Sequence, residues 1–358
     1  MPARPKKLLI TGVCGFAGQT LAHTLREHLP GLEIIGLDNL SRPGSELNRR
    51  HPRDFKFIHG DVRNVSDIEA LPACDWVLDA AANPSVLAGL EHPVASRQLL
   101  EHNLLGTINL LEYCRRHRAG FILLSTSRVY SAGALSTLKM ESINTAFRPS
   151  RKQLWPEGCS EAGIAESFST QPPLSLYGSS KLASEILALE YGSAFGFPVW
   201  LNRCGVLAGA GQFGKADQGI FSYWIQAYAA RRPLKYIGFE GNGFQVRDAL
   251  HPADLAHVLV QQLQQPATKP EPPLNFGGGK ENSMSLAQLS DWCSKRFGPH
   301  KIASERTPRP YDVPWLVMDC RAAARHWDWK PQRNLYSLLE EIADHAEKHP
   351  DWLDLTSA

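Results

Sequence analysis

The sequence predicts an α/β fold, in which a doubly wound parallel sheet is followed by a smaller C-terminal α/β lobe that would bind substrate. The first observation is that short apolar runs alternate with amphipathic helical patterns from Lys7 to Leu124, as in parallel strands joined by helices. The second is a cluster of glycines directly after the first apolar run. The third is that strand and helix patterns return from Tyr177 onwards, after a long polar segment.

Individual elements follow from the spacing of apolar residues, because strands appear as short apolar runs and helices as apolar positions three or four residues apart. Strands are expected at Lys7–Ile10, Glu33–Leu37, Phe55–Ile58, Trp76–Leu78, Phe121–Leu124, Val199–Leu201 and Leu274–Phe276. Helices are expected at Phe16–Leu29, Val94–His117, Tyr177–Phe195, Leu286–Phe297 and Leu335–His349.

The same sequence patterns predict that the chain has two parts. Residues 1–201 are expected to form a dinucleotide-binding domain, with 131–174 as a long loop or small insertion because that stretch is rich in proline and polar residues. Residues 202–358 are expected to form mainly the substrate-binding lobe, with 245–278 returning to the first sheet. Gln264–Pro273, with four prolines, reads as a surface connection.

Composition narrows the possible functions. The chain has 358 residues, of which 43% are hydrophobic and 21% charged, and its formal net charge is +2, so neither nucleic acid nor a membrane is an expected partner. No window approaches the apolar length of a transmembrane helix. The seven cysteines form no C-x-x-C pair and the histidines show no metal-binding spacing. Reduced thiols in a cytoplasmic protein without a metal site are therefore expected.

A phosphate-binding loop is indicated where the first strand meets the first helix. The segment from Thr11 to Gly18 reads T-G-V-C-G-F-A-G. The glycines Gly12, Gly15 and Gly18 would permit a tight turn and bring backbone N–H groups close to a pyrophosphate at the helix N-terminus. This arrangement predicts a Rossmann domain.

A carboxylate lies where such a domain binds the adenosine ribose. Asp38 ends the second strand, twenty residues after Gly18, and there it would accept hydrogen bonds from the ribose hydroxyls and repel a 2′-phosphate. This favours NAD over NADP, and the alternative is a solvated turn acid. Asp61 follows the third strand and would either meet the adenine edge or cap a helix.

A tyrosine and a lysine stand four residues apart at the start of a predicted helix. Tyr177 and Lys181 would share one helix face, where the ammonium group would lower the pKa of the phenol and let it act as a general base. The spacing alone is common on protein surfaces. Its position after a strand that ends in Ser125-Thr126, in a chain that opens with the glycine loop, favours catalysis. Thr126 and Ser127 would place hydroxyls at the edge of the sheet, or would only close the strand end.

Seven motifs together resemble the extended short-chain dehydrogenase/reductase family, specifically its NAD-dependent sugar epimerases and dehydratases. They are Thr11–Gly18, Leu37–Leu40, Gly60–Val62, Ala80–Ala82, Asn103–Thr107, Ser125–Tyr130 and Tyr177–Lys181, and the similarity continues to Asp328–Pro331. The resemblance implies tightly bound NAD and the catalytic set Thr126, Tyr177 and Lys181. It also implies cofactor contacts from Gly12, Gly15, Phe16, Gly18, Asp38, Asn39, Asp61, Val62, Ala80, Ala81, Ala82, Asn103, Tyr177 and Lys181.

The second half resembles the CDP-paratose 2-epimerase branch of that family, through Arg203–Gly209, Asp217–Phe221, Tyr236–Phe239 and Gln245–His251. The resemblance implies a nucleotide-diphosphate sugar as substrate. Arg247 would contact the diphosphate, for which a cation is needed, or would pair with Asp248 or Asp254. The implied substrate contacts are Ser127, Asn202, Gln218, Arg247 and Arg309.

Several departures from the family pattern bear on the substrate. Ser131 replaces the glycine that usually follows Val-Tyr, and the insertion up to Leu174 is longer than usual. The late Asp-x-Arg element reads Asp312-Val313-Pro314, which lacks an arginine that Arg309 would replace. Thr126 is followed by Ser127-Arg128, and not by the Asp-Glu pair of the dehydratases or the glutamate of the decarboxylases.

The leading hypothesis is therefore an NAD-retaining nucleotide-sugar epimerase, a 2-epimerase by resemblance, that works by reversible hydride transfer. The alternatives are a 4-epimerase, a net NAD(P)-dependent oxidoreductase, or a dinucleotide sensor without turnover. By resemblance to the family, the helices at Val94–His117 and Tyr177–Phe195 would pair with symmetry mates in a homodimer or tetramer.

Overall fold

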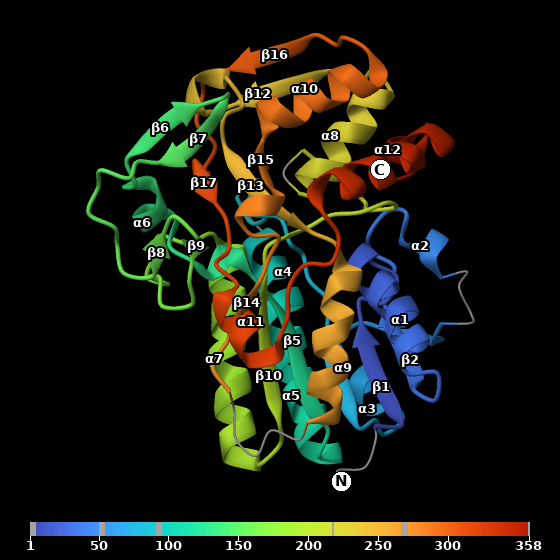
Figure 1. The fold of residues 1–358 in the computed structure, drawn as a ribbon. Coiled ribbons are helices and arrows are strands. Elements are labelled where there is room, and N and C mark those ends of the chain that lie inside the picture. Colours follow the sequence, from blue (N-terminus) through green and yellow to red (C-terminus); the bar gives the residue numbers. More distant parts are fainter. Residues whose placement is uncertain (1–4, 50–53, 91–94, 217, 266–270, 357–358) are drawn as a thin grey trace.

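A parallel sheet of seven strands organises the residues that the computed structural model describes, namely 5–49, 54–90, 95–216, 218–265 and 271–356 (Figure 1). Its strand order is β14-β10-β5-β4-β1-β2-β3. The order reverses between β1 and β4, which is where doubly wound sheets bind their ligands. The predicted fold class is confirmed. The strands are β1 (Lys7–Thr11), β2 (Glu33–Asp38), β3 (Lys56–His59), β4 (Trp76–Asp79), β5 (Gly120–Thr126), β10 (Val199–Cys204) and β14 (Leu274–Phe276).

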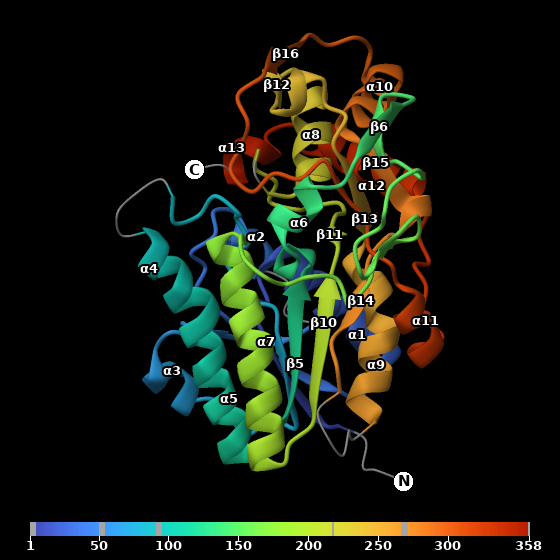
Figure 2. The same ribbon diagram turned by 90° about the vertical axis from the view of Figure 1, so that its left-hand side faces the viewer.

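Helices cover both faces of this sheet, which Figure 2 shows nearly edge-on. Successive strand residues point to opposite faces. In β1, Leu8 and Ile10 pack with the first group of helices, and Leu9 packs with the second group. The first group is α1 (Phe16–His28), α9 (Ala256–Gln264) and α11 (Arg321–Trp327), and the second is α3 (Val65–Glu69), α5 (Gly106–His117) and α7 (Leu176–Phe195).

The long helix expected at 94–117 is interrupted by a π-helical turn. Its described part consists of α4 (Ala95–Leu100), the π-helical turn Glu101–Leu105 and α5, and Val94 lies outside the described residues. Asn103 in this turn is buried, and its side chain contacts the backbone of Asn83 and the hydroxyl of Ser180 on α7. π-Helical turns often occur at functional sites, and this one ties the helix to α7.

The segment 131–174, expected to be a long loop or a small insertion, forms a packed structure. Its cluster of apolar side chains includes Leu135 and Phe168, and it packs against Trp315 of the second lobe. A backbone hydrogen bond from Phe147 to Phe244 (2.8 Å) adds a second connection to that lobe. Its elements are α6 (Ala132–Ser136), β6 (Met140–Ile143), β7 (Ala146–Pro149), β8 (Cys159–Ser160) and β9 (Gly163–Ile164).

A second, smaller sheet and its helices form the C-terminal lobe beyond the carboxyl ends of the large sheet (Figure 1). Of the segment 245–278, which we expected to return to the large sheet, Leu274–Phe276 does so as β14, whereas Val246–Leu250 forms β13 in the second sheet. Part of the expected surface connection 264–273 lies outside the described residues. The remaining elements are α2 (Ser45–Asn48), β11 (Val206–Leu207), α8 (Ile220–Ala229), β12 (Leu234–Ile237), β15 (Ser283–Ser285), α10 (Leu286–Phe297), β16 (Ile302–Glu305), β17 (Trp315–Leu316), α12 (Leu335–Lys348) and α13 (Trp352–Thr356).

A buried ion pair anchors α7 to the large sheet. Arg203 on β10 donates two hydrogen bonds from Nε and Nη2 to the Glu185 carboxylate, at 3.0 and 2.7 Å. The hydroxyl of Ser125 on β5 donates to the same carboxylate at 2.5 Å. Both charged side chains are less than 10% exposed, and Glu185 raises the pKa of Arg203 against the opposing effect of burial. The pair thus fixes α7 across two neighbouring strands.

We expect Glu185→Gln to lower the free energy of unfolding by about 3 kcal/mol, because breaking a buried pair leaves a charge uncompensated. Chemical denaturation followed by circular dichroism measures this value. Glu190→Gln, on the exposed side of the same helix, should change stability by less than about 0.5 kcal/mol. Equal stability of the two variants would contradict the anchoring role.

Candidate active site

A cavity of about 780 Å³ opens where the carboxyl ends of the large sheet face the second lobe. This volume is in the range of small-molecule sites. The glycine loop, the ends of β2, β4 and β5, and the start of α7 line it on one side, and the second lobe lines it on the other. The cavity walls carry seven Lys or Arg residues and two Asp residues, which suits anionic ligands. The basic residues are Arg42, Arg128, Lys181, Lys215, Lys235, Arg247 and Arg309.

The glycine loop lies against the end of β4 and has no room for side chains at two positions. Gly12 has a φ of +63°, and a Cβ there would lie 2.9 Å from the Cα of Ala81. A Cβ on Gly18 would lie 2.2 Å from the carbonyl oxygen of Gly12. The loop therefore packs backbone to backbone at the N-terminus of α1, which leaves N–H groups available to a diphosphate.

A buried carboxylate holds this loop in register with β4. Asp79 accepts hydrogen bonds from the hydroxyls of Thr11 (2.8 Å) and Thr107 (2.9 Å). Thr11 in turn accepts a bond from the backbone N–H of Ala81 at 3.2 Å. The backbone at Ala80–Ala82 is thereby set opposite Gly12, and both line the cavity.

Asp38 ends β2 and faces the cavity, as expected. Its carboxylate accepts bonds from the backbone N–H groups of Cys14 (2.9 Å) and Leu40 (2.8 Å), so it also shapes the glycine loop. Burial raises the pKa of Asp38, and these two donors oppose that shift. Each carboxylate oxygen can accept a further bond, which leaves Asp38 able to bind ribose hydroxyls.

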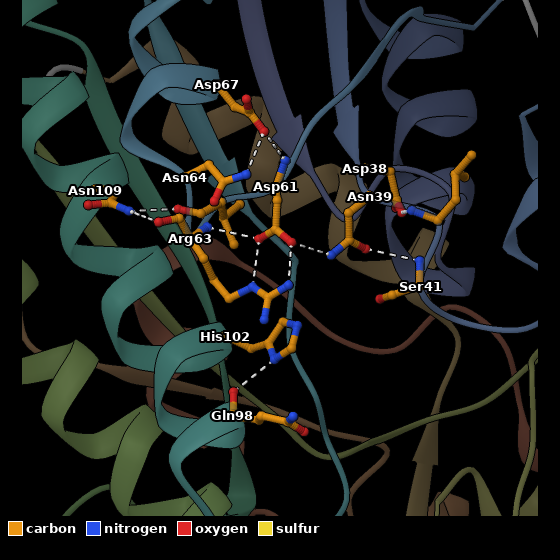
Figure 3. A network of polar contacts seen from close by, with 12 residues as sticks. Asp38, Asn39, Ser41, Asp61, Arg63, Asn64, Asp67, Gln98, His102 and Asn109 are labelled. Atoms are coloured by element: carbon orange, nitrogen blue, oxygen red, sulfur yellow. Dashed lines mark hydrogen bonds and ion pairs between the residues drawn. The ribbon is translucent and has the colours of Figure 1, made fainter. Parts of the chain in front are cut away.

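Asp61 does not reach the cavity, contrary to expectation. Figure 3 shows its carboxylate between Arg63 and Asn39. Arg63 donates to both oxygens, at 3.0 and 2.6 Å, and Asn39 donates at 2.9 Å. These bonds, chiefly those from Arg63, hold the pKa of Asp61 well below its usual range. Asp61 does not cap α3 either, because Asn64 holds that position. Its role is to support Asn39, which lines the cavity together with Val62.

Thr126, Tyr177 and Lys181 meet at the cavity wall. Thr126 ends β5, and Tyr177 and Lys181 lie in the first two turns of α7. Burial raises the pKa of Tyr177 to about 12, while a hydrogen bond with Thr126 lowers it. Burial also lowers the pKa of Lys181, and the nearby Asp79 carboxylate counteracts this. The arrangement places a phenol that can exchange a proton beside two polar partners at the bottom of the cavity.

Two further expected cofactor or substrate contacts are buried beneath the cavity wall. Asn103 lies in the π-helical turn and holds α7, as described above. Asn202 is buried in β10 and exchanges two hydrogen bonds with Gln262 of α9, at 3.0 and 2.9 Å. Neither lines the cavity. The expected direct substrate contact of Asn202 is therefore corrected to a structural role, since its amide is already satisfied.

The remaining expected contacts lie on the cavity surface: Gly15, Phe16, Ser127, Gln218, Arg247 and Arg309. Arg247 pairs with Asp312 at 2.8 Å, and not with Asp248 or Asp254. Burial lowers the pKa of Arg247, and Asp312 opposes this. Arg309 is more exposed and donates to the carbonyl of Ala216 at 3.0 Å.

Other cavity residues were not singled out as contacts from the sequence. They include Asn83, Phe213, Gln245 and Tyr311, each from a loop that becomes part of the wall only on folding. Arg42 also belongs here: it bonds Gln218 at 3.0 Å and the carbonyl of Phe213, and so joins the loop after β2 to the second lobe. No spacing pattern marks these residues in the sequence, because their contacts are distant along the chain.

Among the described residues, no group of three or more His, Cys, Asp or Glu side chains is placed to hold a metal ion. No described helix is both long and apolar enough to cross a membrane.

The fold and the site together are those of a Rossmann-fold enzyme that carries a Tyr-x-x-x-Lys pair at its cavity. The chain belongs to the NAD dependent epimerase/dehydratase family, whose model matches residues 8–277. This confirms the resemblance read from the sequence, and the NAD prediction agrees with it.

Particular relatives narrow the comparison. The chain is 31% identical to a CDP-paratose 2-epimerase of Salmonella typhi over 354 residues, which cover 94% of this chain and 98% of the relative. It is 24% identical to a UDP-glucuronate 4-epimerase of Thermodesulfobacterium geofontis, covering 95% and 96%. In fold it is similar to a UDP-glucuronic acid 4-epimerase of Bacillus cereus solved with UDP-glucuronic acid and NAD, with a TM-score of 0.74, 23% identity and coverage of 96% and 99%.

We expect Asp38→Asn to weaken the discrimination of NAD from NADP by about tenfold, or about 1.4 kcal/mol, because the amide still accepts hydrogen bonds but no longer repels a 2′-phosphate. Fluorescence titration of cofactor-free protein with each dinucleotide measures the ratio. Glu46→Gln makes the same charge change at an exposed site outside the cavity and should leave the ratio unchanged. Preferential binding of NADP by the unaltered protein would contradict the assignment.

Proposed function

We propose that this protein is a nucleotide-sugar epimerase that keeps NAD bound and inverts one carbon of its substrate by reversible hydride transfer, with C2 as the site of inversion. The observation that carries the proposal is that Thr126, Tyr177 and Lys181 line the same cavity as the glycine loop. Similarity to a CDP-paratose 2-epimerase along nearly the whole chain supports inversion at C2. Similarity to UDP-glucose and UDP-glucuronate 4-epimerases makes C4 the second candidate.

The cavity fits NAD by its shape and by the chemistry of its donors. The close backbone packing at Gly12 and Gly18 leaves space for a diphosphate, and Asp38 lines the cavity beside the position that a ribose would occupy. The cofactor contacts we propose along this wall are Gly12, Gly15, Phe16, Gly18, Asp38, Asn39, Val62, Ala80, Ala81, Ala82, Tyr177 and Lys181. Bound NAD supplies a hydride acceptor that can return the hydride.

The chain's own groups manage the proton. We propose that Tyr177 takes the proton of the sugar hydroxyl as the carbon is oxidised and returns it after the sugar has turned its other face. Thr126 orients the reacting oxygen by a hydrogen bond, and the Lys181 ammonium favours the ionised phenol. Burial raises the pKa of Tyr177, and the positive charge of a bound nicotinamide ring would lower it again.

The substrate diphosphate would occupy the second-lobe side of the cavity. Arg247 and Arg309 line it there, and a guanidinium can bind phosphate oxygens in a bidentate manner. Ser127 and Gln218 offer further polar contacts on the same walls. All seven cysteines are free thiols, which supports the cytoplasmic location that we also propose.

We expect Tyr177→Phe to lower turnover roughly 10²- to 10⁴-fold, because it removes the oxygen that carries the proton. NAD should remain bound, since the glycine loop and Asp38 are unaltered. Tyr191→Phe, near the other end of α7 and bonded to Glu112 on the surface, is the matched control and should keep normal turnover.

The assay follows CDP-paratose, UDP-glucose and UDP-glucuronic acid by NMR in deuterium oxide, with no added cofactor. Inversion by hydride transfer leaves the inverted carbon free of solvent deuterium. Deuterium at that carbon, or unchanged turnover in Tyr177→Phe, would refute the proposed mechanism.

We also propose a homodimer, or a tetramer built from two such dimers. Exposed apolar residues on α4, the π-helical turn and α7 include Leu100, Leu105, Ile186 and Phe195. These helices lie side by side on one face (Figure 2). Two copies of this face would bury the exposed apolar groups in a four-helix interface.

Ile186→Glu should convert the assembly to monomers, because it places a charge in the proposed interface. Size-exclusion chromatography with light scattering at micromolar concentration measures the mass. Val65→Glu makes the same change at an exposed site on α3 and should leave the assembly intact. A monomeric unaltered protein would refute the proposal.

A further inference from the structure

Arg128 is fixed directly beside the proposed catalytic groups. It lies in the single 3₁₀ turn Ser127–Val129 that follows β5. Its backbone N–H donates to the Thr126 hydroxyl at 3.2 Å. Its carbonyl packs on the first turn of α7, so closely that a Cβ on Gly178 would lie 2.2 Å from it. The backbone of Arg128 is thus held between Thr126 and Tyr177.

The Arg128 side chain is a cation without a carboxylate of its own. It lines the cavity, and its Nη1 donates to the Tyr311 carbonyl at 3.4 Å. Within the described part of the chain, no carboxylate forms an ion pair with it. The nearby Asp312 is already engaged by Arg247 at 2.8 Å and by the backbone N–H of Val313 at 2.9 Å. A guanidinium has five N–H donors, so Arg128 has donors besides the one that bonds Tyr311.

The electrostatics agree with this geometry. Burial lowers the pKa of Arg128 to about 10, and the neighbouring Arg247 shifts it in the same direction. Arg128 and Arg247 therefore lie near a single carboxylate, that of Asp312, in a partly desolvated cavity wall. This excess of positive charge is unfavourable unless an anionic ligand binds there. The other charged or polar groups that affect the pKa of Arg128 are Asp312 and Tyr177, and both line the same cavity as Arg128.

We infer that Arg128 binds a carboxylate on the sugar ring, so that the preferred substrate is a nucleotide-linked acidic sugar. The inference rests on the proposed function and specifies its substrate class. A sugar carboxylate is favoured over the diphosphate because Arg128 lines the cavity together with Thr126 and Tyr177, while Arg247 and Arg309 remain for the phosphates. A neutral sugar would leave the guanidinium unpaired in the closed complex.

The test compares UDP-glucuronic acid with UDP-glucose, which differ at the sugar carboxylate, by calorimetric titration of the NAD-loaded protein. The unaltered protein should bind UDP-glucuronic acid at least about tenfold more tightly, and Arg128→Gln should weaken that binding by roughly 10- to 100-fold, the range for a charge-assisted hydrogen bond. The affinity of the Arg128→Gln variant for UDP-glucose should equal that of the unaltered protein. Arg128→Lys, which keeps the charge but not the fork of donors, should retain part of the preference. Arg306→Gln, at an exposed pair with Glu240, is the matched control.

Each outcome decides the assignment. Equal weakening of UDP-glucuronic acid, UDP-glucose and UDP itself in Arg128→Gln would assign the residue to the diphosphate and overturn the inference. Equal binding of the two sugars by the unaltered protein, or no binding of UDP-glucuronic acid, would also overturn it, even if Arg128→Gln fails to fold. Acid-selective binding without turnover would count against the proposed epimerase alone. Turnover of neutral sugars without acid selectivity would count against Arg128 alone.

Discussion

The buried ion pair between Glu185 and Arg203 is the constraint on which the site depends. α7 carries Tyr177, the residue proposed to transfer the proton, and a two-bond contact between guanidinium and carboxylate fixes this helix against the sheet. Glu185 lies eight residues after Tyr177 on α7, a little more than two turns along. Tyr130 extends the same network, because Arg203 donates to its hydroxyl at 3.3 Å and that hydroxyl donates to Asn275 on β14 at 2.6 Å. Three adjacent strands thereby position one helix.

A second contact, from the π-helical turn, holds the first half of α7. Asn103 bonds Ser180 at 3.2 Å, and its own carbonyl accepts a bond from Ser184. These contacts lie on either side of Lys181, whose side chain is nearly fully buried. Burying an ammonium group is costly, and these contacts fix the helix on either side of Lys181, which lines the cavity.

The second lobe supplies much of the positive charge of the cavity. The half of the chain that forms the large sheet contributes the glycine loop and the wall with Thr126, Tyr177 and Lys181. Arg247, Arg309 and Lys235 come from segments that lie over the carboxyl edge of the sheet. Arg42 joins the two halves through Gln218 and the Phe213 carbonyl. Two anionic ligands can therefore meet in one enclosure, because neither half alone would surround both. Arg128 belongs to the sheet side by sequence, but its side chain donates a hydrogen bond to the carbonyl of Tyr311 in the second lobe.

The sequence by itself determined the large sheet, the glycine loop, the carboxylate at Asp38 and the Tyr177–Lys181 spacing. These are local features, set by strand and helix periodicity and by glycines that must precede a helix, so neighbouring residues carry the information. Tertiary structure decided the partners of polar side chains: Arg247 pairs with Asp312, Asp61 with Arg63 and Asn39, and Asn202 with Gln262. It also decided that 131–174 packs against the second lobe. Apart from the local pair of Asp61 and Arg63, these side-chain contacts join segments that are 22 to 65 residues apart, and several donors or acceptors of equal chemistry compete for each one. Only the folded chain, by burying one pairing and leaving the others apart, selects among them.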